Sequence, residues 1–208
     1  KKKMNRIKYL FNFFINYKNI LLKVIYYEVL YSFKYLELPF FYIKIHKNSK
    51  FETDSVPCLY YYLYEISKFI NKKKIKKITD LGSGFGRLTN FLARETKAKI
   101  VGIESDKEIF NKAIKIKARN VKLINENFLK LNFKNYRSEC FIMVDPLKHP
   151  KDTIKIQKKI IDSNKGKKGS FYLIMINIDN KLINKKFKKI KLNSHQDAKK
   201  RSIIFLYC

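Results

Sequence analysis

Three glycines separated by single residues are the first feature of this sequence that points to chemistry. Gly82, Gly84 and Gly86 are half of the six glycines in the chain of 208 residues, and Asp80 stands two positions before them. Glycine accepts positive φ angles and lets a ligand lie against the backbone. A helix that begins after such a loop offers free N–H groups and the positive end of a dipole. Residues 80–87 therefore predict a loop that binds a nucleotide-type ligand.

A carboxylate further along the chain fits the same ligand. Glu104 lies 18 residues beyond Gly86, at the end of the apolar run 99–105. A carboxylate in that place accepts hydrogen bonds from two ribose hydroxyls when the preceding strand leads into a glycine loop. Dinucleotide dehydrogenases use the same pair, but their spacing G-x-G-x-x-G is not met, because position 87 is arginine. An acid before the glycines also favours a cationic ligand over a pyrophosphate.

The elements that must position these residues alternate between strand and helix from residue 77. Apolar runs predict strands at 78–81, 99–105, 121–125, 140–144 and 171–178, and the tail predicts two more at about 187–192 and 202–207. Amphipathic patterns predict one helix at 59–70, before the glycine loop, and another directly after that loop. Two further helices are predicted at 107–119 and at about 153–162. Continuous apolar runs are typical of a parallel sheet covered on both faces. The fold class is therefore α/β: a doubly wound, mostly parallel Rossmann-like sheet with a C-terminal antiparallel strand pair and an N-terminal helical extension.

We expect residues 1–52 to form that extension and residues 53–208 to form the ligand-binding domain. The stretch 9–36 is aromatic and apolar nearly all round a helix, but polar residues interrupt it too often for a transmembrane span. Two interpretations remain: a helical cap on the domain, which we favour, or a basic helix lying on an anionic membrane surface. Because no cleavable signal pattern is present, we expect a cytoplasmic protein, either free or peripheral on the inner face of a membrane.

The formal net charge of +30 is large enough to attract nucleic acid or anionic lipid. Lys, Ile, Asn, Tyr and Phe are all abundant, however, and the lysines are spread along the whole chain. A coding bias toward A/T-rich codons explains that composition as well as a binding function does. Three widely spaced cysteines and three separated histidines predict neither a disulfide framework nor a metal site.

The sequence Asp-Leu-Gly-Ser-Gly-Phe-Gly-Arg at positions 80–87 resembles the first motif of class I S-adenosylmethionine-dependent methyltransferases, D/E-x-G-x-G-x-G. The resemblance extends over residues 54–208 and implies S-adenosyl-L-methionine as the cofactor. It also implies the contacts with the cofactor: Asp80 orients the methionine portion, and Gly82, Ser83, Gly84 and Gly86 wrap it. Glu104 holds the ribose, and Asn127 and Phe128 meet the adenine. The family often has Asp where Asn127 stands, and Asn still offers a carbonyl oxygen to an adenine amino group.

The residues Asp145-Pro146-Leu147 follow the fourth predicted strand, where substrate and methyl donor meet in this family. They resemble an incomplete form of the [D/N]-P-P-[F/Y] motif of amino-methylating enzymes, without the second proline and the aromatic residue. Methylation of a nucleic-acid base is therefore not predicted by this motif. Asp145 is the candidate catalytic residue, and an equally good interpretation is an Asp that caps a helix before a proline.

The loop is also similar to that of protein-lysine methyltransferases that modify mitochondrial carrier and ATP-synthase subunits, and of their small bacterial relatives. Those proteins carry a Val-Pro before the preceding helix, matched by Val56-Pro57, and often an N-terminal membrane-associating segment. The resemblance implies methyl transfer to an N or O nucleophile, and leaves the acceptor open among a protein lysine, RNA and a small molecule. The alternative is a basic module on the same fold that binds a membrane or RNA.

Overall fold

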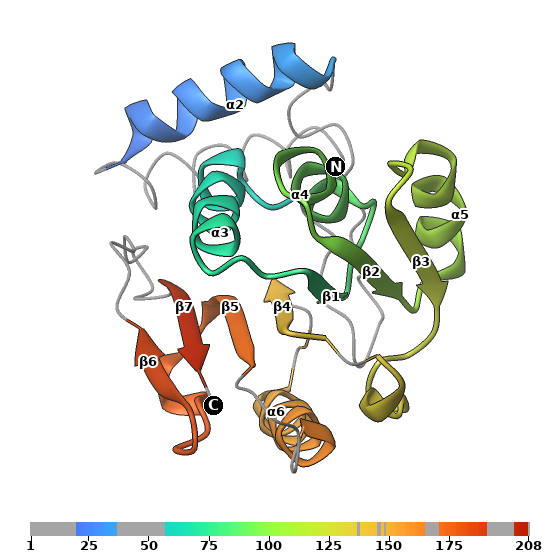
Figure 1. Ribbon diagram of the computed structural model, residues 1–208, viewed down its shortest axis with the longest axis vertical. Helices are drawn as coiled ribbons and strands as arrows, with labels where there is room; N and C mark the ends of the chain where they lie inside the picture. Colours follow the sequence, from blue (N-terminus) through green and yellow to red (C-terminus); the bar gives the residue numbers. More distant parts are fainter. Residues whose placement is uncertain are drawn as a thin grey trace, which may run out of the picture.

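The computed structural model describes residues 20–36, 57–136, 138–144, 147, 149–164, 171–190 and 202–207. Helices cover both faces of one sheet (Figure 1). The strands are β1 (Lys77–Leu81), β2 (Lys99–Glu104), β3 (Val121–Asn125), β4 (Cys140–Val144), β5 (Tyr172–Ile178), β6 (Lys188–Ile190) and β7 (Ser202–Tyr207). The α-helices are α2 (Leu21–Tyr35), α3 (Tyr60–Lys72), α4 (Arg87–Glu95), α5 (Lys107–Ile116) and α6 (Pro150–Asn164), and short 3-10 turns lie at Phe133–Asn135 and Asn180–Leu182.

The strand order is β3-β2-β1-β4-β5-β7-β6, and the first five strands are parallel. This arrangement confirms the predicted doubly wound α/β fold with a C-terminal antiparallel strand. The last strand in the chain, β7, lies antiparallel between β5 and β6, so the tail completes the sheet by insertion. The order reverses between β1 and β4, and ligands of open α/β sheets bind beyond the carboxyl ends of the strands at such a point.

Two apolar cores lie on opposite faces of the sheet, and successive residues of each central strand contribute to them in turn. On β4, Cys140 and Ile142 belong to the core beneath α3 and α4, whereas Phe141 and Met143 belong to the core beneath α6. All four side chains are fully buried. Burial on both faces explains why these strands read as unbroken apolar runs in the sequence.

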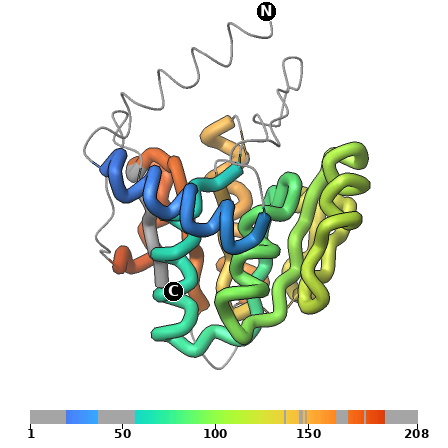
Figure 2. Tube along the Cα trace, turned by 90° about the horizontal axis from the view of Figure 1, so that it is seen from above, coloured from blue at the N-terminus to red at the C-terminus, as the bar shows by residue number. Residues whose placement is uncertain are grey.

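Helix α2 is the outermost layer and lies across α3 and α4 (Figure 1, Figure 2). Its inner face buries Val24, Glu28 and Tyr31. The ring of Tyr31 lies 5.4 Å from that of Tyr60 and 4.8 Å from that of Phe91, edge-on to the latter. The described part of the stretch 9–36 is thus a packed cap, and residues 9–19 lie outside the described residues. No helix in the described ranges is long and apolar enough to cross a membrane.

A buried carboxylate, Glu28, helps to fasten this cap to the domain. Glu28 accepts a hydrogen bond from the Tyr60 N–H at 2.7 Å, and its second oxygen pairs with the Arg87 guanidinium at 2.7 Å. Arg87 also lies 3.8 Å above the Tyr60 ring and donates to the Cys58 carbonyl at 3.2 Å. Burial lowers the pKa of Arg87, but the adjacent charge of Glu28 outweighs it and raises the pKa above its ordinary value. The ion pair is almost fully buried, with side-chain exposures of 10% and 7%.

Replacing one partner of this buried pair should cost much more stability than breaking an exposed pair. Arg87→Ala leaves Glu28 charged and desolvated, so we expect the free energy of unfolding to fall by about 3–5 kcal/mol. The matched control, Lys112→Ala, breaks the exposed Lys112–Glu108 pair on α5 and should cost less than about 1 kcal/mol. Urea denaturation followed by circular dichroism measures both, and similar losses in the two variants would contradict the role given to Glu28.

Candidate functional site

The loop between β1 and α4 has the backbone that its glycines require. Gly82, Gly84 and Gly86 have φ angles of 82°, 55° and 86°, and Gly86 is the N-cap of α4. The N–H groups of Gly82 and Ser83 donate to the Ile103 carbonyl at 2.9 and 3.0 Å, so the loop turns back onto the end of β2. A side chain at a glycine with such a φ angle would be strained. The predicted loop is therefore present and is anchored to the neighbouring strand.

A fourth glycine, which sequence patterns did not single out, allows this close approach. Gly102 lies on β2 opposite Asp80 of β1. A Cβ atom built on Gly102 would lie 2.7 Å from a methyl of Leu123 and 2.9 Å from side-chain carbons of Ser83 and Thr89. Because real Cβ contacts are not that short, any other residue would push the loop or α4 away from β2. An isolated glycine inside a strand was the signal available in the sequence.

The predicted ribose-binding carboxylate lies beside the loop. Glu104 is buried, and its two oxygens accept hydrogen bonds from the N–H groups of Gly84 and Asp106, both at 2.8 Å. The side chain of Asn125, opposite Glu104 on β3, donates to the Glu104 carbonyl at 2.8 Å and to the Ser105 carbonyl at 3.2 Å. Sequence reasoning missed Asn125 because its partners belong to another strand. Together these bonds hold Glu104 against the middle of the loop.

Asp80 lies at the other end of the loop and is nearly sealed from solvent, with 1% of its surface exposed. In the part of the chain that the structure describes, neither its Oδ2 atom nor the Ser83 hydroxyl has a hydrogen-bond partner. Burial, and secondly the charge of Glu104, raise the pKa of Asp80 to about 8. A buried carboxylate oxygen without a partner is costly and fits a site that a cationic ligand completes. The ammonium and sulfonium groups of S-adenosylmethionine supply such a cation.

The predicted adenine contacts follow β3, at the same edge of the sheet as Glu104. Asn127 is exposed, and its side-chain oxygen accepts the N–H of Leu129 at 2.9 Å in a local turn. Phe128 is buried in the core beneath α6. Their contacts with adenine stay predictions. Asp145 lies outside the described residues, and its catalytic role also stays a prediction. Within the described ranges, no cluster of three or more His, Cys, Asp or Glu side chains could hold a metal ion.

The family model for ribosomal RNA adenine dimethylases matches residues 31–206. The chain belongs to this family. The family is one of class I S-adenosylmethionine-dependent methyltransferases, which confirms the resemblance drawn from the loop and the cofactor that it implies. The family is named for methylation of adenine in ribosomal RNA, whereas the incomplete motif at 145–147 does not by itself predict methylation of a base.

A curated relative, the ribosomal RNA small subunit methyltransferase A of a Hydrogenobaculum species, is 29% identical over 75 residues. The match covers 36% of this chain and 29% of that relative. Among solved structures, the fold resembles an RNA methyltransferase from Salinibacter ruber in complex with S-adenosyl-L-homocysteine, with 15% identity, a TM-score of 0.50 and coverage of 68% of this chain and 88% of that one. A candidate RNA methyltransferase from Pyrococcus horikoshii gives 18% identity, a TM-score of 0.51 and coverage of 72% and 83%. At these identities the structures show a common fold.

The raised pKa of Asp80 predicts a pH-dependent affinity for the cofactor. The ionised carboxylate attracts the ammonium group of the methionine end, which S-adenosyl-L-homocysteine shares with S-adenosylmethionine. The protonated form, which dominates below about pH 8, therefore binds more weakly. We expect the affinity for S-adenosyl-L-homocysteine to rise by up to about tenfold per pH unit from pH 6 toward pH 8 and then to level off, with proton release on binding. Calorimetry in buffers of different ionisation enthalpy measures both. Asp80→Asn should bind weakly at every pH, the exposed Asp179→Asn should behave as the wild type, and an unchanged slope in Asp80→Asn would refute the assignment.

Gly102 offers a second test of the site, independent of charge. Gly102→Ala forces the loop away from β2, so we expect a loss of about 1–3 kcal/mol in stability together with a clear loss of cofactor affinity. Val101→Ala is the matched control on the same strand, because it removes half-buried apolar volume without touching the loop. Thermal unfolding with and without S-adenosyl-L-homocysteine separates the two effects. A Gly102→Ala protein with unchanged melting and unchanged ligand shift would show that the close packing is not required.

Proposed function

We propose that this protein transfers methyl groups from S-adenosylmethionine to the exocyclic N6 amine of adenine in RNA. The observation that carries the proposal is buried Asp80, whose Oδ2 atom has no hydrogen-bond partner among the described residues. It lies beside a glycine loop that Glu104 holds, within a chain matched to the adenine dimethylase family over residues 31–206. Two methyl groups on one adenine require the exocyclic amine, since that nitrogen alone carries two hydrogens. The chain and its curated relative overlap over less than a third of the relative, so the acceptor is inferred from the family and from chemistry.

The residues of the loop have separate tasks in this proposal. When bound, S-adenosylmethionine supplies an electrophilic methyl group on a sulfonium cation. Ionised Asp80 attracts the positive methionine end, and the glycine backbone lets that end lie close to the loop. Glu104 already accepts two backbone N–H groups, but a carboxylate has about four acceptor positions, so it can also accept the ribose hydroxyls. The chain therefore contributes mainly position and orientation, which is the chief requirement of a direct transfer between two bound groups.

The amine of adenine needs help as a nucleophile, because its lone pair is conjugated with the ring. A hydrogen-bond acceptor on its N–H groups would turn the lone pair toward the methyl group and take up the positive charge that develops. We assign this task to Asp145. The support is its place in the chain: it follows Val144 at the end of β4, and β4 pairs with β1 through Met143 and Leu81, directly before the glycine loop.

RNA is favoured as the acceptor because the net charge of +30 suits a polyanion and the family is named for ribosomal RNA. The resemblance of the loop suggests a protein lysine as the acceptor, with Asp145 or Glu126 accepting the proton of that lysine. The relatives named above give no evidence for or against a lysine acceptor. A basic binding module without methyl transfer is the remaining alternative. Contact with a membrane surface is a separate proposal, because it depends on the outer face of α2 and not on the loop.

Methyl transfer can be followed with labelled S-adenosylmethionine and a cell extract sorted into RNA, protein, lipid and small molecules. We expect label in RNA, recovered after digestion as N6-methylated adenosines. Glu104→Gln should weaken cofactor affinity by about 10–100-fold, since a charged acceptor for two hydroxyls is lost. Lys112→Ala, an exposed change on α5, should leave activity unchanged.

The outcomes separate the candidates. Label in protein would replace the RNA assignment with a protein acceptor. Salt-sensitive binding to RNA without cofactor binding or label would favour the binding module. Label in RNA that Glu104→Gln does not reduce would contradict the site.

A further inference from the structure

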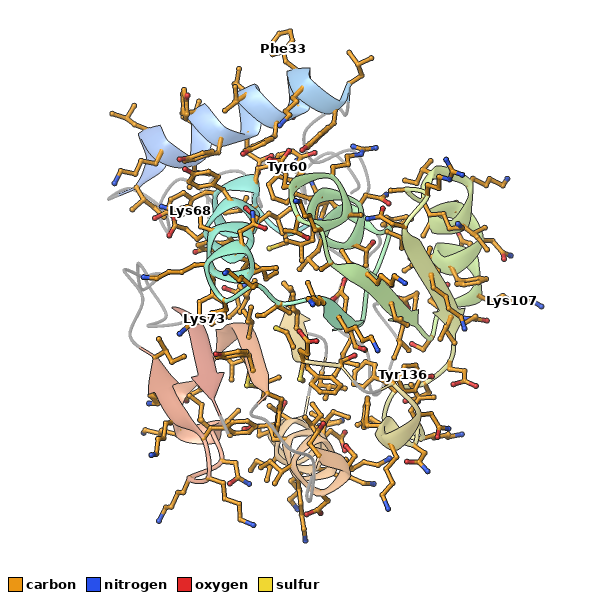
Figure 3. All side chains as sticks on the ribbon, in the orientation of Figure 1. Phe33, Tyr60, Lys68, Lys73, Lys107 and Tyr136 are labelled. Carbon is orange, nitrogen blue, oxygen red and sulfur yellow. The ribbon has the colours of Figure 1, made fainter. Side chains whose placement is uncertain are left out.

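The outer face of α2 exposes an unusual concentration of large apolar side chains. Seven of the ten exposed large hydrophobic residues in the described ranges lie on α2 or at its C-cap: Leu22, Ile25, Tyr26, Val29, Leu30, Phe33 and Leu36. Leu22, Phe33 and Leu36 are 84%, 79% and 92% exposed. We call these seven residues the α2 outer face. Figure 3 shows Phe33 pointing away from the body of the protein. Apolar patches of this kind on a folded protein mark interaction surfaces.

The spacing turns these residues into one stripe. Positions 22, 26, 29, 33 and 36 recur every three or four residues, so they lie along one side of the helix. The inner face of α2 is also apolar and is already packed on α3 and α4. The packing of α2 on the domain therefore does not require the outer stripe. A helix that merely capped the domain would carry polar residues outside. The stripe therefore needs another explanation than folding.

The exposed charges on α2 itself are both positive. On α2 the exposed charged residues are Lys23 and Lys34, the second paired with Glu95 at 2.6 Å, and the helix's one acid, Glu28, is buried against Arg87. In the first 36 residues of the chain, eight Lys and Arg residues accompany that single acid. An apolar stripe with a cationic margin complements an anionic surface whose interior is apolar.

A groove between α2 and α3 lies beside one end of the stripe. It has a volume of about 510 Å³, and Leu22, Lys23, Tyr26, Tyr61, Tyr64 and Lys68 line it. Glu65 also lines it, 3.8 Å from Lys68. Leu22 and Tyr26 belong to both the groove and the stripe, so the two lysines that line the groove lie where the apolar stripe begins. This sequence of polar and apolar groups matches that of a phospholipid, from headgroup phosphate to acyl chain.

We propose that the α2 outer face docks on a membrane containing anionic phospholipid. The helix lies in the plane of the interface, with Leu22 and Phe33 among the acyl chains and Lys23 and Lys68 against headgroup phosphates. This surface is independent of the glycine loop and of the methyl transfer proposed for it. It would hold the protein on the surface without a spanning helix.

Two other occupants fit the observations less well. The first is a second copy of the chain. Lys23 and Lys34 are 11 residues apart and lie on the same flank of the stripe, so antiparallel pairing of two α2 faces would bring Lys23 of one copy beside Lys34 of the other. Like charges placed opposite each other are destabilising. RNA would contact the lysines but would leave aliphatic side chains such as Leu22 exposed. A lipid surface satisfies the lysines and the stripe together.

Flotation of the full chain with vesicles tests the proposal. We expect binding to vesicles of phosphatidylcholine with phosphatidylglycerol, and much weaker binding to phosphatidylcholine alone. The double variant Leu22→Ser, Phe33→Ser should lose at least about tenfold in partition, because two apolar side chains no longer enter the acyl region. The matched control Ile114→Ser, Ile154→Ser removes exposed apolar side chains from α5 and α6 and should bind as the wild type.

We expect both double variants to stay folded. Their affinity for S-adenosyl-L-homocysteine, measured separately from membrane binding, should then equal that of the wild type. Absence of vesicle binding by the wild type, or equal binding by wild type and the Leu22/Phe33 double variant, would overturn the proposal. Self-association of the wild type in ultracentrifugation that this double variant abolishes, without vesicle binding, would assign the face to a second copy of the chain instead.

Discussion

The buried pair of Glu28 and Arg87 joins three parts of the molecule that are far apart in sequence. Glu28 belongs to the outermost helix, its first oxygen serves the N-terminus of α3, and its second meets the residue that begins α4 directly after Gly86. Two charges in this setting are stable only while each has the other. The position of the outer helix and the start of the cofactor loop are therefore coupled, although the two charged residues are separated by 59 positions.

The parts of the fold that sequence could predict are those decided by local patterns. Apolar runs located the strands because both faces of the sheet are buried, and the glycines with Asp80 and Glu104 located the site because each belongs to a strand end. Glu28, Gly102 and Asn125 were missed for a common reason: their importance comes from partners on other elements, which no local period reports. The insertion of β7 between β5 and β6 was missed likewise, since alternation indicates a strand but not its neighbours.

Donor and acceptor differ in how far a sequence can reveal them. The predicted donor site consists of backbone conformations and two carboxylates, which leave a compact signature in the sequence. The acceptor leaves no such signature here: the incomplete motif at Asp145 does not indicate a base, whereas the family that matches residues 31–206 is named for methylation of adenine. The outer face of α2 shows a third situation: its helix was expected, but two apolar faces on one helix look like a single buried one until the packing reveals which face is covered.

Gly102 has a consequence for the dimensions of the site. It lies 16 residues beyond Gly86 and outside any glycine motif. The loop nevertheless packs so closely against it that a Cβ atom on Gly102 would lie 2.9 Å from the Ser83 side chain. In the proposed complex, Asp80 meets the methionine end of the cofactor and Glu104 the ribose, and they stand on neighbouring strands whose separation hydrogen bonding fixes. The distance between the methionine end and the ribose that the site accepts is thus set by strand spacing and by the absence of one side chain. The loop therefore selects its ligand by size rather than by closing flexibly around it.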